Sequence, residues 1–204
     1  MNPYIADTSY STSALIRLIF EEEYEIEMLS QERDSLLRKA EFYYKAFSSK
    51  DMQEDFDEIR VMYDFGQMAK ARKEADEVQA QINVLEASID VKDFSLGALS
   101  GALLQIAKQG ISLTHGGLSA CPSGRSIGSE SLKNVIWQAR NQSMHFEEGN
   151  LHRRVRLCFQ NLENDFGAQF SLATNPPLNL ARHVVRLLEW GDYTQYEKDM
   201  GSII

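Results

Sequence analysis

Apolar residues recur at intervals of three and four along the first part of the chain, the spacing of one face of an α-helix. The pattern predicts a long helix from Ser11 to about Phe47, with an apolar face made of Leu15, Leu18, Ile19, Ile26, Leu29, Leu36 and Leu37. Ser11, Thr12 and Ser13 are suitable helix caps, so we expect the helix to begin there. The polar residues 48–51 then predict a turn.

A second long helix should follow this turn. Its apolar positions alternate spacings of four and three, which is the seam of a coiled coil over about three heptads. The seam residues are Ala71, Ala75, Val78, Ile82, Leu85 and Ile89. We therefore expect residues 1–95 to form an antiparallel, coiled-coil-like helical hairpin, separate from residues 96–204.

The second half of the chain predicts a helical bundle. Residues 96–111 are rich in Ala, Gly and Leu, and residues 115–129 contain four glycines and a proline, which indicates a long loop. A helix is expected over about 130–148, with Gly149 as its C-cap, and two more over about 155–166 and 180–188. No stretch alternates apolar and polar residues as a half-buried strand does, so the predicted fold class is all-α.

Composition and charge narrow the class of protein. Hydrophobic residues make up 43% and charged residues 25%, the usual values of a globular chain. Two cysteines are too few for a zinc framework. Because neither a signal peptide nor a membrane-spanning run is apparent, we expect a cytoplasmic protein that does not enter a membrane.

The net charge of −9 is distributed unevenly. Residues 1–95 carry 21 acidic and 11 basic residues, whereas residues 96–204 carry 9 and 10. The acidic hairpin is a poor surface for a polyanion, but the second half also gathers arginines, which suit forked contacts to phosphate.

The most informative stretch ends the predicted helix 130–148. It contains Arg140, Asn141 and His145, followed by Gly149. This pattern resembles the Arg-x4-6-His motif of the HEPN family (higher eukaryotes and prokaryotes nucleotide-binding), and the resemblance covers about residues 96–190. It implies a dimeric ribonuclease that needs no metal or cofactor, acting in toxin–antitoxin or defence systems under the control of an antitoxin or regulatory protein.

The chemistry of these residue types agrees with that function. Metal-independent RNA cleavage needs a base for the 2′-hydroxyl, an acid for the leaving 5′-oxygen and a cation for the phosphoryl oxygens. We predict His145 as the acid and base, Arg140 as the cation, and Asn141 as a positioning residue. Arg125, Arg153 and Arg154 are predicted to bind the RNA substrate.

Helical geometry constrains this site. At about 100° per residue, Arg140 and His145 point about 140° apart, so a regular helix does not bring them together. Either the helix loosens before Gly149, or a two-fold axis sets two copies of the motif face to face. The resemblance implies the second arrangement, and we predict a homodimer with a composite Arg/His site.

Other functions fit parts of the sequence. Arg140 can form a surface ion pair with Glu130, Glu147 or Glu148, and His145 can be a cation at a helix C-terminus. The chain would then be a non-catalytic module that binds nucleotide, RNA or a partner protein, or a coiled-coil adaptor. His145, Glu148 and His152 make a poor metal site because Gly149 interrupts the helix, and Cys121 has no evident base partner.

Overall fold

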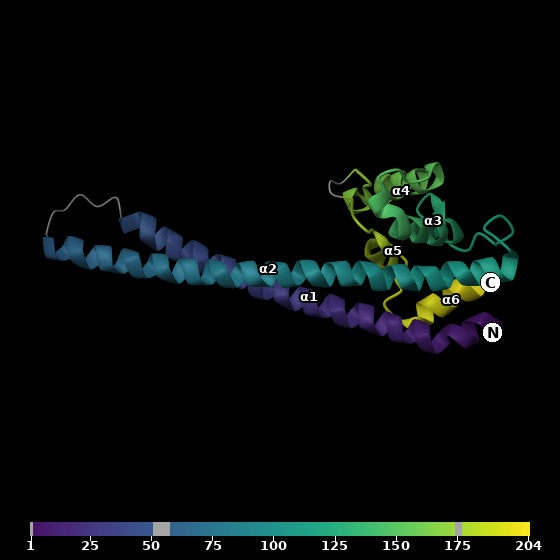
Figure 1. Ribbon diagram of the computed structural model, residues 1–204, viewed down its shortest axis with the longest axis horizontal. Coiled ribbons are helices and arrows are strands. Elements are labelled where there is room, and N and C mark those ends of the chain that lie inside the picture. Colours follow the sequence, from purple (N-terminus) through teal and green to yellow (C-terminus); the bar gives the residue numbers. More distant parts are fainter. Residues whose placement is uncertain (1, 51–57, 174–176) are drawn as a thin grey trace. The chain divides into compact units, whose positions relative to one another are not determined.

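The computed structural model describes residues 2–50, 58–173 and 177–204 (Figure 1). The predicted all-α class is confirmed. The α-helices are α1 (Pro3–Lys50), α2 (Glu58–His115), α3 (Leu132–His145), α4 (Arg153–Phe166), α5 (Ala181–Leu187) and α6 (Tyr193–Ile203). Short 3-10 turns follow α3 and α4, at Phe146–Glu148 and Ala168–Phe170. Among the described residues, no helix is long and apolar enough to span a membrane.

The chain divides into two compact units, and α1 and α2 each contribute to both. One unit contains residues up to Glu23 together with Phe94–Ile204, and the other contains Tyr24–Asp93. In this division the first turns of α1 join the unit that holds the second half of the chain. They do so because Ile5, Ile16 and Ile19 are buried there and the Tyr4 hydroxyl donates to the carbonyl oxygen of Ile106 at 2.7 Å.

The unit Tyr24–Asp93 is a pair of antiparallel helical segments. Val78, Ile82 and Ile89 are buried along the predicted seam, and the Lys92 ammonium contacts the Glu25 carboxylate at 2.6 Å. This ion pair joins the start of the α1 segment to the end of the α2 segment, as an antiparallel arrangement requires. Ala71 and Ala75 lie outside the described side chains.

The predicted start of the first helix at Ser11–Ser13 is wrong, because α1 begins at Pro3. Asn2 caps it by accepting a hydrogen bond from the Tyr4 amide at 2.8 Å, and proline suits the first helical position. The hydroxyls inside the helix donate to preceding carbonyl oxygens instead of capping: Thr8 to Tyr4 at 2.8 Å and Ser13 to Ser9 at 2.7 Å.

Small residues of α2 allow close approach of other segments. A side chain at Gly110 would meet the ring of Tyr4 at 2.7 Å, and one at Gly101 would meet the Ser143 hydroxyl of α3 at 3.2 Å. The Ala- and Gly-rich composition of residues 96–111 therefore reflects the packing of α1 and α3 against this part of α2.

The Gly-rich loop before α3 is held by specific contacts. The His115 ring donates from Nε2 to the carbonyl oxygen of Ile203 at 2.6 Å, and the Lys133 ammonium donates to the carbonyl oxygen of Cys121. The loop ends in a two-stranded ribbon of β1 (Ser126–Ile127) and β2 (Glu130–Ser131), which the sequence pattern did not predict. Two residues are too few to show an alternating pattern.

Helices α4 and α5 lie close to their predicted positions, whereas α6 was not predicted. Its cap is Asp192, which accepts hydrogen bonds from the amides of Thr194 at 2.7 Å and Gln195 at 3.1 Å. Tyr196, Met200 and Ile203 are its buried apolar residues. Their spacing of four and three is the signal that could have identified this helix.

Candidate functional site

Helix α3 and the turn after it position the predicted motif. The helix is anchored by the buried side chains of Leu132, Val135, Ile136 and Ala139. It runs through His145, continues as the 3-10 turn Phe146–Glu148, and ends at Gly149 with φ +67°. Gly149 thus stops the helix as predicted, because the left-handed conformation favours glycine.

Arg140 and His145 are not brought together in one chain. The Arg140 Nε donates to the side-chain oxygen of Gln105 on α2, and its Nη1 donates to Oδ1 of Asn141 at 3.2 Å. The helix loosens at His145, where φ is −131° and ψ is 13°, but the hydrogen bonds of Arg140 go to Gln105 and Asn141 and not to His145. The guanidinium of Arg140 contacts the amide of Asn141 instead.

His145 is paired with Glu148, three residues later. The His145 side chain is 49% exposed, and its Nδ1 lies within hydrogen-bond distance of a Glu148 carboxylate oxygen. An ionised carboxylate can only accept, which assigns the hydrogen to Nδ1 and leaves a lone pair on Nε2 of the neutral ring. This is the tautomer that a general base requires.

A groove of about 630 Å³ opens beside this pair. Two histidines, two arginines, one carboxylate and two amides contribute to its wall. The lining residues are Asn141, His145, Glu148, Asn150, Leu151, His152, Arg153, Val155 and Arg156. The groove therefore combines proton-transfer groups with cations.

His152 has the opposite tautomer preference to His145. It is the N-cap of α4, and its Nδ1 accepts a hydrogen bond from the backbone amide of Arg154 at 3.3 Å. An accepting Nδ1 places the ring hydrogen on Nε2 in the neutral form. The groove thus holds one imidazole with a lone pair on Nε2 and another with a hydrogen on Nε2 in the neutral form.

The three predicted substrate-binding arginines lie in different surroundings. Arg153 lines the groove, and Arg154 and Arg125 are not among its lining residues. The Arg125 guanidinium forms a fork with the Asp199 carboxylate at 2.8 and 3.0 Å and donates to the carbonyl oxygen of Leu188 at 2.8 Å. These contacts bind the loop to α6.

Sequence reasoning gave no catalytic role to Glu148 or His152 and no definite role to Arg156. Arg153 and Arg156 are three residues apart on one helix, so they share a face, while Arg154 does not. That spacing could have selected Arg156 over Arg154. The spacing of His145, Glu148 and His152 did group these residues, but as a metal site on one continuous helix. In the structure His145 and His152 line the same groove on either side of the turn at Gly149.

The cysteines offer no nucleophile. Both Cys121 and Cys158 are buried and free. Burial raises the pKa of the Cys121 thiol, an effect that Lys133 partly opposes. Burial also raises the pKa of the Cys158 thiol, and the charge of Glu130 adds to this increase. In the described part of the chain, no group of three His, Cys, Asp or Glu side chains could hold a metal ion.

Comparison with known proteins provides no relative for this chain. No protein-family model matches it, and neither does any curated protein or solved structure.

Proposed function

We propose that the protein is a metal-independent endoribonuclease of the HEPN type, with its active site in the groove between the end of α3 and the start of α4. The observation that carries this proposal is the pair of histidines, His145 and His152, with opposite tautomer preferences in one groove that also contains Arg153 and Arg156. General acid–base catalysis uses this combination of groups.

The proposed reaction is an internal transfer of the phosphoryl group. His145 Nε2 takes the proton of the 2′-hydroxyl, and the 2′-oxygen attacks phosphorus. The bond from phosphorus to the 5′-oxygen breaks, and that oxygen receives the Nε2 proton of His152, whose ring enters the step as the imidazolium and leaves it neutral. The products are a 2′,3′-cyclic phosphate and a 5′-hydroxyl. Arg153 and Arg156 bind the non-bridging oxygens, which carry growing negative charge in the transition state.

In this proposal Arg140 positions Asn141, whereas the motif alone predicts that Arg140 stabilises the phosphoryl charge. Its Nη1 bond to Asn141 fixes the amide that lines the groove. Asn141 is then directed to a phosphate oxygen, and Arg140 acts as its positioning residue within one chain. In a homodimer, a two-fold axis at the groove would give Arg140 a direct role in a composite site.

A wild-type cleavage assay tests the proposal. We expect the purified protein to cut unstructured RNA in the presence of EDTA, and we expect the cut ends to carry 2′,3′-cyclic phosphate. The ends are identified by mass spectrometry, and 2′-deoxy substitution at the cleaved position is the matched control because it removes the attacking oxygen. Cleavage of the 2′-deoxy position, or loss of cleavage in EDTA, would contradict the mechanism.

Mixing two inactive variants tests the homodimer. If the dimer has two composite sites, each with Arg140 of one subunit and His145 of the other, folded Arg140→Ala and His145→Ala subunits should together recover about one quarter of wild-type activity, since half of the dimers are mixed and each has one intact site out of two. Each variant mixed with itself is the control. Failure of the mixture to recover activity, with subunit exchange verified, would assign the whole site to one chain.

A second candidate is a non-catalytic module that binds RNA, nucleotide or a partner protein. It is favoured by the Gln105 contact that directs Arg140 Nε to α2 and by the Glu148 carboxylate in the groove, which repels phosphate. RNA that binds with a marked salt dependence but is never cut would support this candidate. The toxin or defence role and the antitoxin partner are parts of the ribonuclease proposal. Evidence against the ribonuclease would therefore also be evidence against them.

A further inference from the structure

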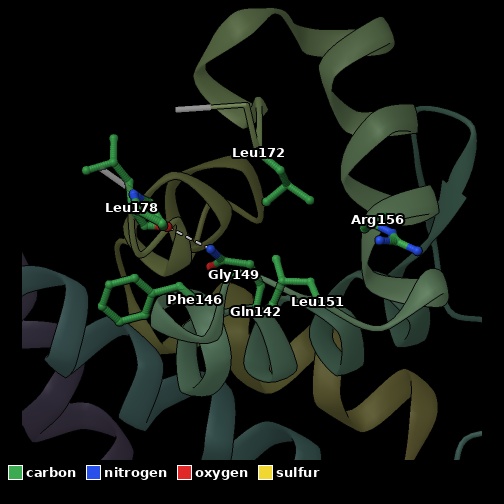
Figure 2. Close-up of a pocket in the computed structure, with 8 residues that line it drawn as sticks. Gln142, Phe146, Gly149, Leu151, Arg156, Leu172 and Leu178 are labelled. Carbon is green, nitrogen blue, oxygen red and sulfur yellow. Dashed lines mark hydrogen bonds between the residues drawn. The ribbon is translucent and has the colours of Figure 1, made fainter. Parts of the chain in front are cut away.

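We propose that a pocket next to the groove binds one unstacked base of the RNA substrate; this inference rests on the proposed function. The pocket has a volume of about 230 Å³, and its walls include Gln142, Phe146, Leu151, Arg156, Leu172 and Leu178 (Figure 2). Figure 2 shows Phe146 and Leu178 on one side and Arg156 on the other.

The pocket and the groove are neighbours that share part of their walls. Leu151 and Arg156 line both of them, and Phe146 directly follows His145 in the chain. A nucleotide whose phosphate lies against Arg156 in the groove can therefore direct its base into the pocket. The shared Arg156 therefore favours a base of the bound RNA as the occupant of the pocket.

The size of the pocket limits what can enter it. Pockets for drug-sized ligands have volumes of about 300–1,000 Å³, so a pocket of about 230 Å³ suits a single ring system and not a whole nucleotide. A base in a duplex is stacked and paired, whereas a base in a single strand can turn outward. The pocket thus favours single-stranded over double-stranded RNA.

The chemistry of the wall also suits a base. The half-buried Phe146 ring can stack on a base, and the leucines remove its faces from water. The Gln142 amide is held in one orientation, because its nitrogen donates to the Leu178 carbonyl oxygen at 2.7 Å and its oxygen accepts from the Leu180 amide at 2.9 Å. These two bonds use one of the two N–H groups of the Gln142 amide nitrogen and one of the two lone pairs of its amide oxygen.

Binding of adenosine 5′-monophosphate and ribose 5-phosphate in EDTA tests the pocket without any cleavage. These ligands differ only in the base, so a base pocket should give the nucleotide an affinity on the order of tenfold higher. Calorimetry measures the affinities, and methyl and aromatic NMR signals of Phe146, Leu172 and Leu178 locate the base. Equal affinities, or no binding of the nucleotide, would overturn the proposal.

Two leucine variants provide the matched comparison. Leu178 in the pocket is 50% exposed, and Leu157 on α4, outside both the pocket and the groove, is 55% exposed. Leu178→Ala should lower the affinity for the nucleotide several-fold and leave that for ribose 5-phosphate unchanged, whereas Leu157→Ala should change neither. Phe146→Leu, which keeps an apolar side chain but removes the ring, should act like Leu178→Ala. Equal effects of Leu178→Ala and Leu157→Ala would overturn the assignment of the base to this pocket.

The outcome is separable from that of the ribonuclease proposal. Base-dependent binding by a protein that never cleaves RNA would keep the pocket and reject the ribonuclease. Cleavage that is equally fast on single-stranded and fully paired RNA, with no preference for the nucleotide, would keep the ribonuclease and reject the pocket.

Discussion

His145→Ala is expected to lower the rate of RNA cleavage by about 100- to 10,000-fold, the usual contribution of a general acid or base. The imidazole is the proposed acceptor of the 2′-hydroxyl proton, and alanine leaves no group in its place. The side chain is 49% exposed and bonds to an exposed carboxylate, so we expect the free energy of unfolding to change by less than about 0.5 kcal/mol. Single-turnover cleavage and circular dichroism measure the two effects.

Other variants divide the roles within the groove. His152→Ala should reduce the rate within the same range, because the leaving oxygen then lacks its proton donor. Glu148→Ala should cost less, since it removes only the group that orients His145. The matched control is His115→Gln, in which an amide N–H can replace the ring N–H that bonds to Ile203 far along the chain. A folded His145→Ala protein that cleaves at the wild-type rate would reject the proposed site.

Asp199→Ala is expected to destabilise the protein by about 3 kcal/mol, the lower end of the cost of breaking a buried ion pair. The Asp199 side chain is only 3% exposed. It accepts hydrogen bonds from Arg125 at 2.8 and 3.0 Å, from the Trp190 indole at 2.9 Å and from the side-chain amide of Gln195 at 3.2 Å. Alanine leaves these donors without their acceptor, although Arg125, at 36% exposure, can regain some hydration.

Urea denaturation followed by circular dichroism measures this effect. Lys198→Ala, on the exposed side of the same helix, is the control and should change the unfolding free energy by less than about 0.5 kcal/mol. Arg125→Ala should also destabilise the protein, while the folded fraction should keep its affinity for RNA. A stable Arg125→Ala protein with weakened RNA binding would instead indicate that Arg125 binds the RNA substrate.

Much of the local structure is determined by the sequence. The all-α class, the seam from Val78 to Ile89 and the helix end at Gly149 follow from spacing and from glycine's access to a left-handed backbone. The start of α1 was missed because serine and threonine hydroxyls have two local uses. They cap a helix when they precede it, and they donate to preceding carbonyl oxygens when they lie inside it, and the residue type does not distinguish the two.

The tertiary structure decided the site. Spacing alone already indicated that Asn141 and His145 share a helix face and that Arg140 points elsewhere. It could not indicate that Arg140 meets Gln105, that Arg125 meets a carboxylate 74 positions away, or that the turn at Gly149 brings His152 into the groove of His145. The spacing of residues along the sequence gives the direction of their side chains only within one regular helix. These contacts depend on how separate segments pack, so the sequence alone does not predict them.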